Sequence, residues 1–414
     1  MIGLYRDDVV CYGFLMYPNT KDIPKILILS TLNLKGGRSG CRGILDYAHK
    51  HGPWRCLLLE GRTGEQLLNI KRLAISGVIT HTLSRHEAAI VASLQVPVVV
   101  TEPWPEMLAP DFPIANAPYV KMDSHGVGVL AAEYYLKRGY QAFAYVGEPL
   151  GMYWSADRLR GFTETLAKAG FGCVIYDTFK QRERRNWDVE RPRMIRFLQK
   201  LPKPTAIFAA MDGRARLVLD ACAEADIRVP EEIAVLGVDN DPILCESTVP
   251  TLSSIRTGGF RRGLKAAEML DELMHGHPVT HRNVLMGPLT VVTRESTGYD
   301  AMRDPFLARA LRFIHSVAPR HRICVGDVVQ AAGCSRRYIE QHFRTRLHAT
   351  VRDIILQTKL ERVRALLEES NLSIGEIAEQ CGFVNESHLA VLFRKAEGIS
   401  MRDYRKQNRE PPDN

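Results

Sequence analysis

Short apolar runs alternate with amphipathic stretches over most of the chain. Strand-sized runs rich in Val, Ile and Leu occur at residues 25–30, 55–60, 77–80, 96–101, 140–147, 172–176, 206–210 and 233–238. Segments with helical periodicity separate them, as at 43–51. Buried parallel strands joined by helices have this texture. The pattern therefore predicts an α/β domain with enough strands for two lobes.

The spacing of apolar residues along the chain changes near residue 301. From residue 306 to residue 405 each periodic segment has the spacing of a helix, and no strand pattern recurs. We therefore divide the chain into an N-terminal extension at 1–22, an α/β domain at 23–300 and an all-helical domain at 301–414. We expect the chain to cross between the two α/β lobes near residues 139, 255 and 284.

The helical domain repeats one local pattern. An apolar stripe at 325–332 ends at Gly333, after which Ser335 can cap the next helix. The same order recurs from 373 to 385, so the domain contains two helix-turn-helix units. A helix at about 351–369 joins them and is roughly 28 Å long at 1.5 Å per residue. That length is close to the roughly 34 Å between successive major grooves, so one chain could read two adjacent grooves.

The second helix of each unit has one face that can pack and one that DNA can contact. In the first unit the outward residues are Ser335, Arg336, Arg337, Glu340, Gln341 and Arg344. In the second unit they are Asn385, Glu386, Ser387, His388, Val391 and Arg394. In the major groove Arg can pair with guanine and Gln with adenine, while a flanking Arg can neutralise phosphate. For one unit, a small bundle with solvated charges is an open alternative; two units in tandem favour double-stranded DNA as the partner.

Composition narrows the class of protein. The 414 residues are 45% hydrophobic and 25% charged, which excludes a disordered chain. The net charge is +8, and residues 305–414 hold 18 Lys and Arg against 13 Asp and Glu, a mild indication of a polyanion partner. No apolar run approaches the roughly 20 residues that span a bilayer, and no secretory signal pattern opens the chain. We therefore expect a cytoplasmic protein that does not bind membranes.

Three motifs lie in the helical domain, at residues 373–383 (SIGEIAEQCGF), 392–398 (LFRKAEG) and 403–405 (DYR). Through these motifs the domain resembles the AraC/XylS class of transcription regulators. Three positions depart from the class: Met401 replaces a usual Pro, His388-Leu389 replaces a common aromatic pair, and Val391 replaces a frequent base-reading Arg. The resemblance implies a DNA-binding domain, and the departures leave its fold intact, but the base specificity of the class does not carry over to the second unit.

The larger domain has five motif-like segments, at residues 40–44, 51–54, 157–162, 206–212 and 234–240. Through these segments it resembles the sugar-sensing domains of the LacI/GalR and periplasmic-binding type. The resemblance implies a two-lobed fold with a ligand between the lobes, and polar contacts from Asp123, Arg158, Asp212 and Asp239. Trp154 and Trp187 are candidates to stack on a sugar ring, and Arg38 could reach in from the first lobe. A polyol needs fixed acceptors, donors and an apolar surface, which these residue types supply.

The order of the two parts is similar to that in regulators of bacterial xylose operons. Residues 186–187, 197–202 and 213–216 add local matches. The resemblance implies a pentose, with xylose first, as the effector, and a transcription regulator whose DNA binding the sugar controls. We expect a homodimer, since lobes of this kind usually pair, and RNA polymerase as a further partner.

Two patterns resemble those of an enzyme or a metal site but do not outweigh the regulator interpretation. Residues 126–131 (GVGVLA) match a loose dinucleotide-binding fingerprint, with Glu148 following a strand. His275, His277 and His281 could ligate a metal, but Gly276 and Pro278 make a solvated turn the better interpretation. Nine cysteines form no Cys-x-x-Cys pair, and no P-loop, nucleophile elbow or His-Glu-x-x-His occurs. We expect no cofactor, no metal and no catalysis; the alternative is a sugar-binding or NAD-dependent enzyme with a helical interaction tail.

Overall fold

The computed structural model describes most of residues 23–408. The residues left out within that span are 33, 60–69, 71–72, 82, 149–151, 177–186, 280, 298–303, 348 and 371. The predicted extension at 1–22 and the predicted domain boundary at 301 lie outside the described residues. Among the described helices, none is long and apolar enough to cross a membrane.

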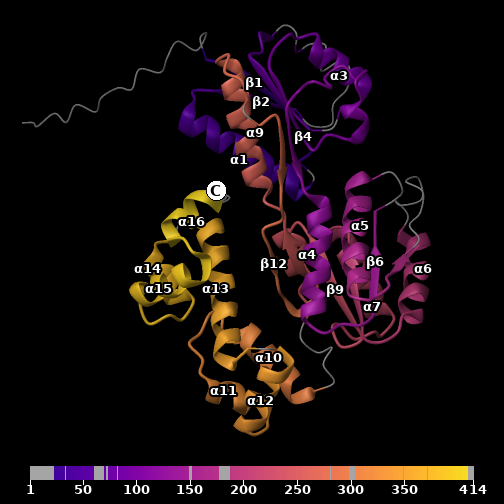
Figure 1. Cartoon of the computed structure of the whole chain (residues 1–414), viewed down its shortest axis with the longest axis vertical. Helices are drawn as coiled ribbons and strands as arrows, with labels where there is room; N and C mark the ends of the chain where they lie inside the picture. Colours follow the sequence, from indigo (N-terminus) through magenta and orange to yellow (C-terminus); the bar gives the residue numbers. More distant parts are fainter. Residues whose placement is uncertain are drawn as a thin grey trace, which may run out of the picture.

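The first lobe is built on a six-stranded parallel sheet in the order β11-β5-β4-β3-β1-β2 (Figure 1). Its strands are β1 (Lys25–Leu29), β2 (Arg55–Leu59), β3 (Gly77–Thr80), β4 (Val98–Thr101), β5 (Tyr119–Met122) and β11 (Asn283–Met286). Helices α1 (Lys35–His51) and α9 (Gly259–Met274) cover one face of the sheet. The other face packs against α3 (Arg85–Ala92) and the short η2 (Pro105–Leu108).

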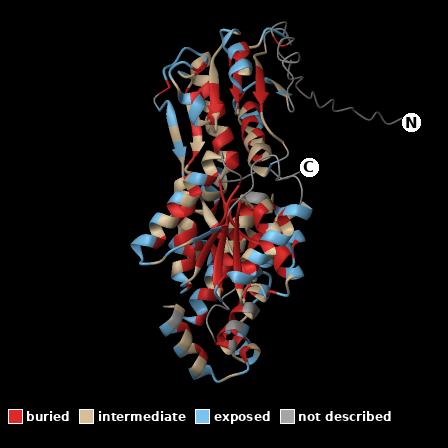
Figure 2. Cartoon of the chain, turned by 90° about the vertical axis from the view of Figure 1, so that its right-hand side faces the viewer, coloured by how far each residue is buried: buried red, intermediate tan, exposed pale blue. Residues whose placement is uncertain are grey.

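The second lobe repeats this layering. Its sheet has the order β12-β10-β9-β8-β6-β7, and β12 is antiparallel to β10. The strands are β6 (Phe143–Val146), β7 (Val174–Tyr176), β8 (Thr205–Ala209), β9 (Ile233–Val238), β10 (Ser253–Arg256) and β12 (Thr290–Val292). The helices are α4 (Ser124–Lys137), α5 (Tyr153–Lys168), α6 (Trp187–Lys200), α7 (Asp212–Glu224), α8 (Pro242–Ser247) and η3 (Glu295–Thr297). Figure 2 shows these strands as a buried layer between helices, as two-sided parallel sheets require.

The chain crosses between the lobes three times. It crosses after β5 at residue 123, after β10 near 257, and between β11 and β12 near 288. The expected crossings near 255 and 284 agree with these positions, whereas the expected crossing near 139 is wrong. The first crossing comes earlier because β5 is the last strand of the first lobe before α4, which already belongs to the second lobe.

Glycines bring α4 and α5 into close contact. A methyl group on Gly128 would lie 2.0 Å from the carbonyl oxygen of Arg158, and one on Gly161 would lie 2.1 Å from that of His125. Only glycine permits this approach of two helix backbones. Gly128, part of the fingerprint-like residues 126–131, therefore serves helix packing, which accounts for it without a nucleotide.

The C-terminal domain is entirely helical in its described part. Its helices are α10 (Pro305–Val317), α11 (Val325–Ala332), α12 (Arg336–Leu347), α13 (Val351–Glu369), α14 (Ile374–Gln380), α15 (Glu386–Glu397) and α16 (Met401–Asn408). The first half of α13 packs with α10, α11 and α12, and its second half packs with α14, α15 and α16. The predicted joining helix at 351–369 is confirmed. Gly333, with φ +71°, and Gly382, with φ +63°, occupy the predicted breaks after α11 and α14.

The helical domain lies beside both lobes (Figure 1). Helix α16 touches α9 of the first lobe. Burial raises the pKa of Tyr404 on α16, and Arg256 and Arg261 act on it from the α/β domain. On the second lobe, Arg138 at the end of α4 is close enough to act on Glu361 of α13. Burial raises the pKa of Glu361 to about 7, against the influence of Arg364 and Arg138. A change in the angle between the lobes would therefore disturb the contacts of this domain.

Candidate functional site

The lobes meet through polar contacts at the carboxyl ends of their strands. Arg38 of α1 pairs with Asp241, which follows β9, at 2.8 Å. Lys35 donates to the backbone carbonyl oxygen of Asn240 at 2.7 Å. The Tyr153 hydroxyl donates to the Glu102 carboxylate at 3.4 Å. Ligands of open α/β sheets bind beyond the carboxyl ends of the strands, so these contacts border the candidate ligand site.

Asp212 lies at this border with its carboxylate already bonded within the second lobe. One oxygen accepts from the Ser254 hydroxyl at 2.5 Å, and the other accepts from the backbone N–H of Asp241 at 2.7 Å. Burial, followed by the nearby charge of Asp239, raises the pKa of Asp212 to about 7. These bonds place Asp212 as a support for the loop after β9, rather than as a side chain with oxygens directed outward.

Asp239 is differently placed. It follows β9 in the left-handed backbone region with φ +102°. One carboxylate oxygen accepts from the Thr257 hydroxyl at 3.1 Å. The other accepts no hydrogen bond from the part of the chain that the structure describes. Asp239 therefore retains acceptor capacity for a ligand.

Arg158 and Trp154 form one unit on α5. The guanidinium group lies 4.8 Å from the centre of the Trp154 ring and donates to the backbone carbonyl oxygen of Ala210 at the end of β8. The buried Nε atom of Arg158 has no hydrogen-bond partner among the described residues. A buried donor without a partner costs about 1–3 kcal/mol. A ligand hydroxyl would remove that cost.

The remaining predicted ligand residues are placed less directly. Asp123 caps α4 by accepting from the backbone N–H of Gly126 at 2.8 Å. The Arg38 side chain is 40% exposed and bridges the lobes through Asp241. Trp187 begins α6, but its side chain lies outside the described residues. The structure thus brings Asp239 and Arg158 with Trp154 to the strand ends of the second lobe, and Arg38 to the edge of the first.

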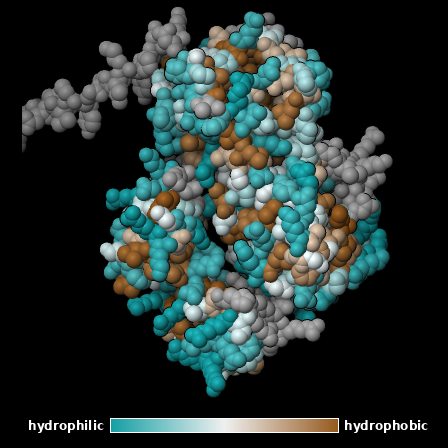
Figure 3. Space-filling view, viewed as in Figure 1, coloured by the Kyte–Doolittle hydropathy of each residue, from teal (hydrophilic) through white to brown (hydrophobic). Residues whose placement is uncertain are grey.

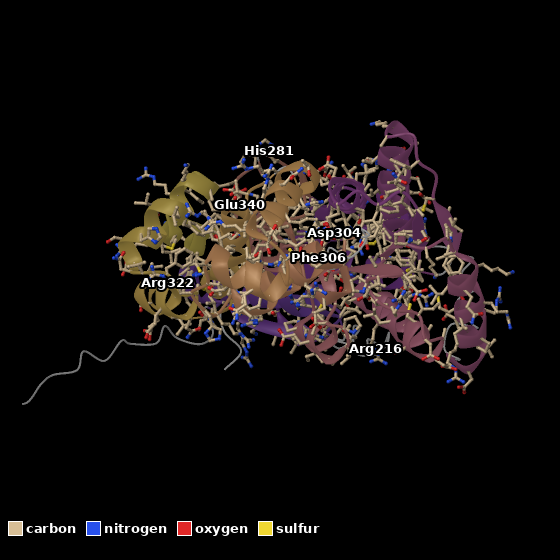
Figure 4. The ribbon with its side chains drawn as sticks, turned by 90° about the horizontal axis from the view of Figure 1, so that it is seen from below. Arg216, His281, Asp304, Phe306, Arg322 and Glu340 are labelled. Carbon is tan, nitrogen blue, oxygen red and sulfur yellow. The ribbon has the colours of Figure 1, made fainter. Side chains whose placement is uncertain are left out.

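The first helix-turn-helix unit presents its predicted residues outward. The Ser335 hydroxyl caps α12 by accepting from the backbone N–H of Tyr338 at 3.2 Å. Ile339 and Phe343 are fully buried. The residues along the opposite side, which line a concave surface, are Arg336, Arg337, Glu340, Gln341, Arg344 and Thr345. Figure 4 shows this domain from below, with Glu340 at its surface.

The second unit has the same layout. The Asn385 side chain caps α15 by accepting from the backbone N–H of His388 at 2.8 Å. Leu389 and Phe393 are fully buried in the core. The predicted residues Asn385, Glu386, Ser387, His388, Val391 and Arg394 are all exposed. Both units therefore have a buried stripe on the second helix and an exposed stripe opposite it, which is polar except at Val391, as a major-groove reader requires.

Comparisons with known proteins agree with this layout. Residues 132–297 match the family model of a periplasmic binding protein-like domain, and residues 328–407 match that of a helix-turn-helix domain. The chain is 29% identical over 388 residues to the xylose operon regulatory protein of Haemophilus influenzae, covering 93% of this chain and 99% of that protein. The chain is an AraC-type transcription regulator with a periplasmic-binding-like domain.

One further relative and one solved structure are similar to the regulator over nearly all of its sequence. The xylose operon regulatory protein of Escherichia coli K12 is 28% identical to it over 93% of this chain and 98% of that protein. The solved structure of the xylose-binding transcription activator XylR is also 28% identical, with a TM-score of 0.59, and covers 93% of this chain and 98% of that chain. The similarity therefore extends over both domains of this chain and over nearly the whole length of each relative.

Two buried polar groups in the regulator's α/β domain were not predicted from the sequence. Ser124, after β5, and Asn240, after β9, are buried, and their side-chain oxygens have no hydrogen-bond partner among the described residues. Each directly follows an Asp that was predicted. The signal in the sequence is their position at the end of a strand, directly after the charged residue that was predicted.

A basic groove between the two units was also missed. It is lined by Arg322, Arg336, Arg352 and Lys359, with His388 at its edge. Lys359 donates to the carbonyl oxygen of Gly382 at 2.7 Å. A methyl group on Gly382 would lie 2.7 Å from the backbone nitrogen of Arg322. The two units of the regulator are thus held against each other, which fixes the separation of their second helices.

The histidines that resembled a metal site do not form one. His275 Nδ1 donates a hydrogen bond to the backbone carbonyl oxygen of Asp271 at 2.9 Å, and its ring stacks near that of His277. Across the described residues, no group of three His, Cys, Asp or Glu side chains could hold a metal ion. The interpretation as a solvated turn accounts for this segment of the regulator.

Proposed function

We propose that this regulator binds a pentose, with D-xylose as the first candidate, between its two lobes, and that the sugar controls DNA binding by the helical domain. The observation that carries the proposal is that the helical domain touches α9 of the first lobe and lies near Arg138 of the second. The relatives named for a xylose operon, which align over nearly the whole chain, support the choice of sugar.

The sugar site is proposed at the carboxyl ends of the second lobe's strands. Asp239 supplies acceptors for sugar hydroxyls, Arg158 supplies donors, and the Trp154 ring supplies an apolar surface. Asn240 and Ser124 add buried oxygens without partners in the described chain. Such groups discriminate strongly, because an analogue that lacks the matching hydroxyl leaves them unpaired.

Helix α4 is the proposed route from the sugar to the DNA-binding domain. It begins at Asp123, at the crossing between the lobes, and ends at Arg138, beside α13. Burial lowers the pKa of His315 on α10 to about 4, and Arg138 acts on it in the same direction. A sugar that binds one arrangement of the lobes more tightly shifts the population toward that arrangement. The helical domain, which lies against both lobes, then changes its position with them.

DNA is the proposed partner of both helix-turn-helix units. A homodimer would place two such domains on repeated half-sites, and RNA polymerase is the proposed further partner at the promoter. We expect the regulator to act in the cytoplasm, where its DNA lies. We propose no catalytic role, because the residues at the strand ends have binding roles and the relatives are regulators.

Arg337→Ala should weaken specific binding by about 1–3 kcal/mol and relax the sequence preference at one position, because an exposed Arg on α12 can pair with a guanine. Arg336→Ala should weaken binding to all sequences more evenly. Arg336 is held by Glu340 at 2.8 Å at the start of the helix, where it can meet a phosphate. Gel-shift titration against specific and scrambled duplexes measures both effects.

The matched control is Arg216→Ala, an exposed Arg on α7 that forms a similar ion pair with Asp220. It lies in the second lobe, away from the helical domain (Figure 4). Its DNA affinity should equal that of the wild type. If Arg336→Ala and Arg337→Ala also bind as the wild type does, α12 is not the DNA reader.

A further inference from the structure

Two valines on the second helix-turn-helix unit are exposed without a reason in the fold. Val384 is 62% exposed and Val391 is 68% exposed. Val391 and His388 are three residues apart on α15 and so share one side of the helix, while Val384 lies in the bend just before the helix begins. The opposite stripe, with Leu389 and Phe393, already fills the core. The two valines are therefore not part of the domain's own packing.

This apolar face is continuous with the proposed DNA-binding surface. Asn385, Glu386 and Ser387 are exposed at the start of the same helix, and Arg394 and Lys395 are exposed near its end. Figure 3 shows apolar surface over the α14–α15 part of the domain, among hydrophilic residues. Cationic side chains beside an apolar patch suit a polyanion that also carries apolar groups.

The first unit differs in chemistry at the same place. The outward residues of α12 are polar or charged, and the arginines and glutamine among them can form hydrogen bonds with guanine or adenine. Valine has no donor or acceptor. In the major groove, the apolar feature that a base pair offers is the C5 methyl group of thymine. The two units are therefore built to read different features of DNA.

We propose that Val391 contacts a thymine methyl group in the major groove, with Val384 just before the helix as a second apolar contact, so that the second unit selects its half-site by apolar contact. This inference rests on the proposed function, because it takes the same surface to be a DNA reader. It assigns to the operator one or two thymines beneath α15, and it assigns hydrogen-bonded purines to the half-site beneath α12.

The test replaces thymine by deoxyuridine, which removes the methyl group and leaves the base pair intact. The full-length protein is titrated with duplexes from the region upstream of its own gene, each carrying one such replacement. We expect one or two positions in one half-site to weaken binding about 3- to 10-fold, as for the loss of a buried methyl contact. Val391→Ala should weaken binding to the unmodified duplex by a similar factor.

Combining the Val391→Ala substitution with the deoxyuridine replacement tests whether the valine and the methyl group contact each other. On the Val391→Ala protein, the same deoxyuridine should have little further effect, because its partner is already gone. Val249→Ala, at a valine that is 90% exposed in the second lobe, is the matched control and should bind as the wild type does.

Three outcomes would overturn the inference. Salt-dependent, sequence-specific binding that no deoxyuridine changes would refute the methyl contact and leave the proposed function standing. Suppose instead that Val391→Ala dissociates a dimer in sedimentation experiments, and that the deoxyuridine effects add to the effect of the substitution. The valines would then contact a second copy of the chain and not DNA. Absence of sequence-specific binding in the wild type would refute both the inference and the proposed function.

Discussion

Asp239→Asn is expected to weaken pentose binding about 30- to 150-fold, the loss of about 2–3 kcal/mol that follows when a charged acceptor is removed. Asp239 has one carboxylate oxygen bonded to Thr257 and the other without a partner in the described chain. Asparagine keeps the size of the side chain and tolerates the positive φ of +102° at this position, whereas alanine would strain it. Calorimetric titration with D-xylose and its pentose isomers measures the affinity.

The matched control for this substitution is Asp226→Asn. Asp226 also has a positive φ, of +54°, but it is exposed in the turn after α7, at the far end of that helix from β8. We expect Asp226→Asn to bind sugar as the wild type does, and both variants to unfold at the same urea concentration. Retained sugar affinity in folded Asp239→Asn would remove Asp239 from the site.

Glu190→Ala is expected to lower the free energy of unfolding of the second lobe by about 3–5 kcal/mol, because it leaves a buried charge without its partner. Glu190 of α6 and Arg214 of α7 form two hydrogen bonds, of 2.6 and 3.1 Å. Their side chains are 3% and 4% exposed. Urea unfolding, followed by circular dichroism, measures the loss. Replacing both residues, as Glu190→Leu with Arg214→Met, should restore most of it.

A second ion pair between the same two helices supplies the control. Arg191 and Glu224 lie 3.2 Å apart, with side chains 42% and 44% exposed. Exposed ion pairs contribute about 0–1 kcal/mol to the free energy of unfolding. Glu224→Ala should therefore change the free energy of unfolding by less than about 1 kcal/mol. A loss below about 1 kcal/mol in Glu190→Ala as well would mean that the Glu190–Arg214 pair does not hold α6 on α7.

Local patterns predicted the helical domain well because its helix ends depend on neighbours in sequence. Helix α13 begins where Thr350 and Asp353 form a reciprocal cap, and Gly333 and Gly382 end the helices before them. The strands of both lobes were found for a similar reason, since a buried parallel strand is apolar over its whole length. The exposed faces of α12 and α15 then followed from helical periodicity alone.

Contacts between distant segments could not be predicted in this way. Arg38 and Asp241 are 203 residues apart, and their ion pair depends on how the two lobes meet. The role of Asp212, at the start of α7, depends on Ser254, which lies on strand β10. The first crossing was misplaced because α4 carries no mark in its sequence of the lobe on which it packs. The close approach at Gly128 and Gly161 decides that packing.

The most direct test of sugar-controlled DNA binding is fluorescence anisotropy of the full-length protein on a labelled duplex from the region upstream of its own gene. The titration is run at several salt concentrations, with and without each of a panel of pentoses. We predict sequence-specific binding whose affinity one pentose, D-xylose first, changes by a factor within the 5- to 150-fold range of typical allosteric coupling, about 1–3 kcal/mol. Binding that is insensitive to both sequence and sugar would contradict the account.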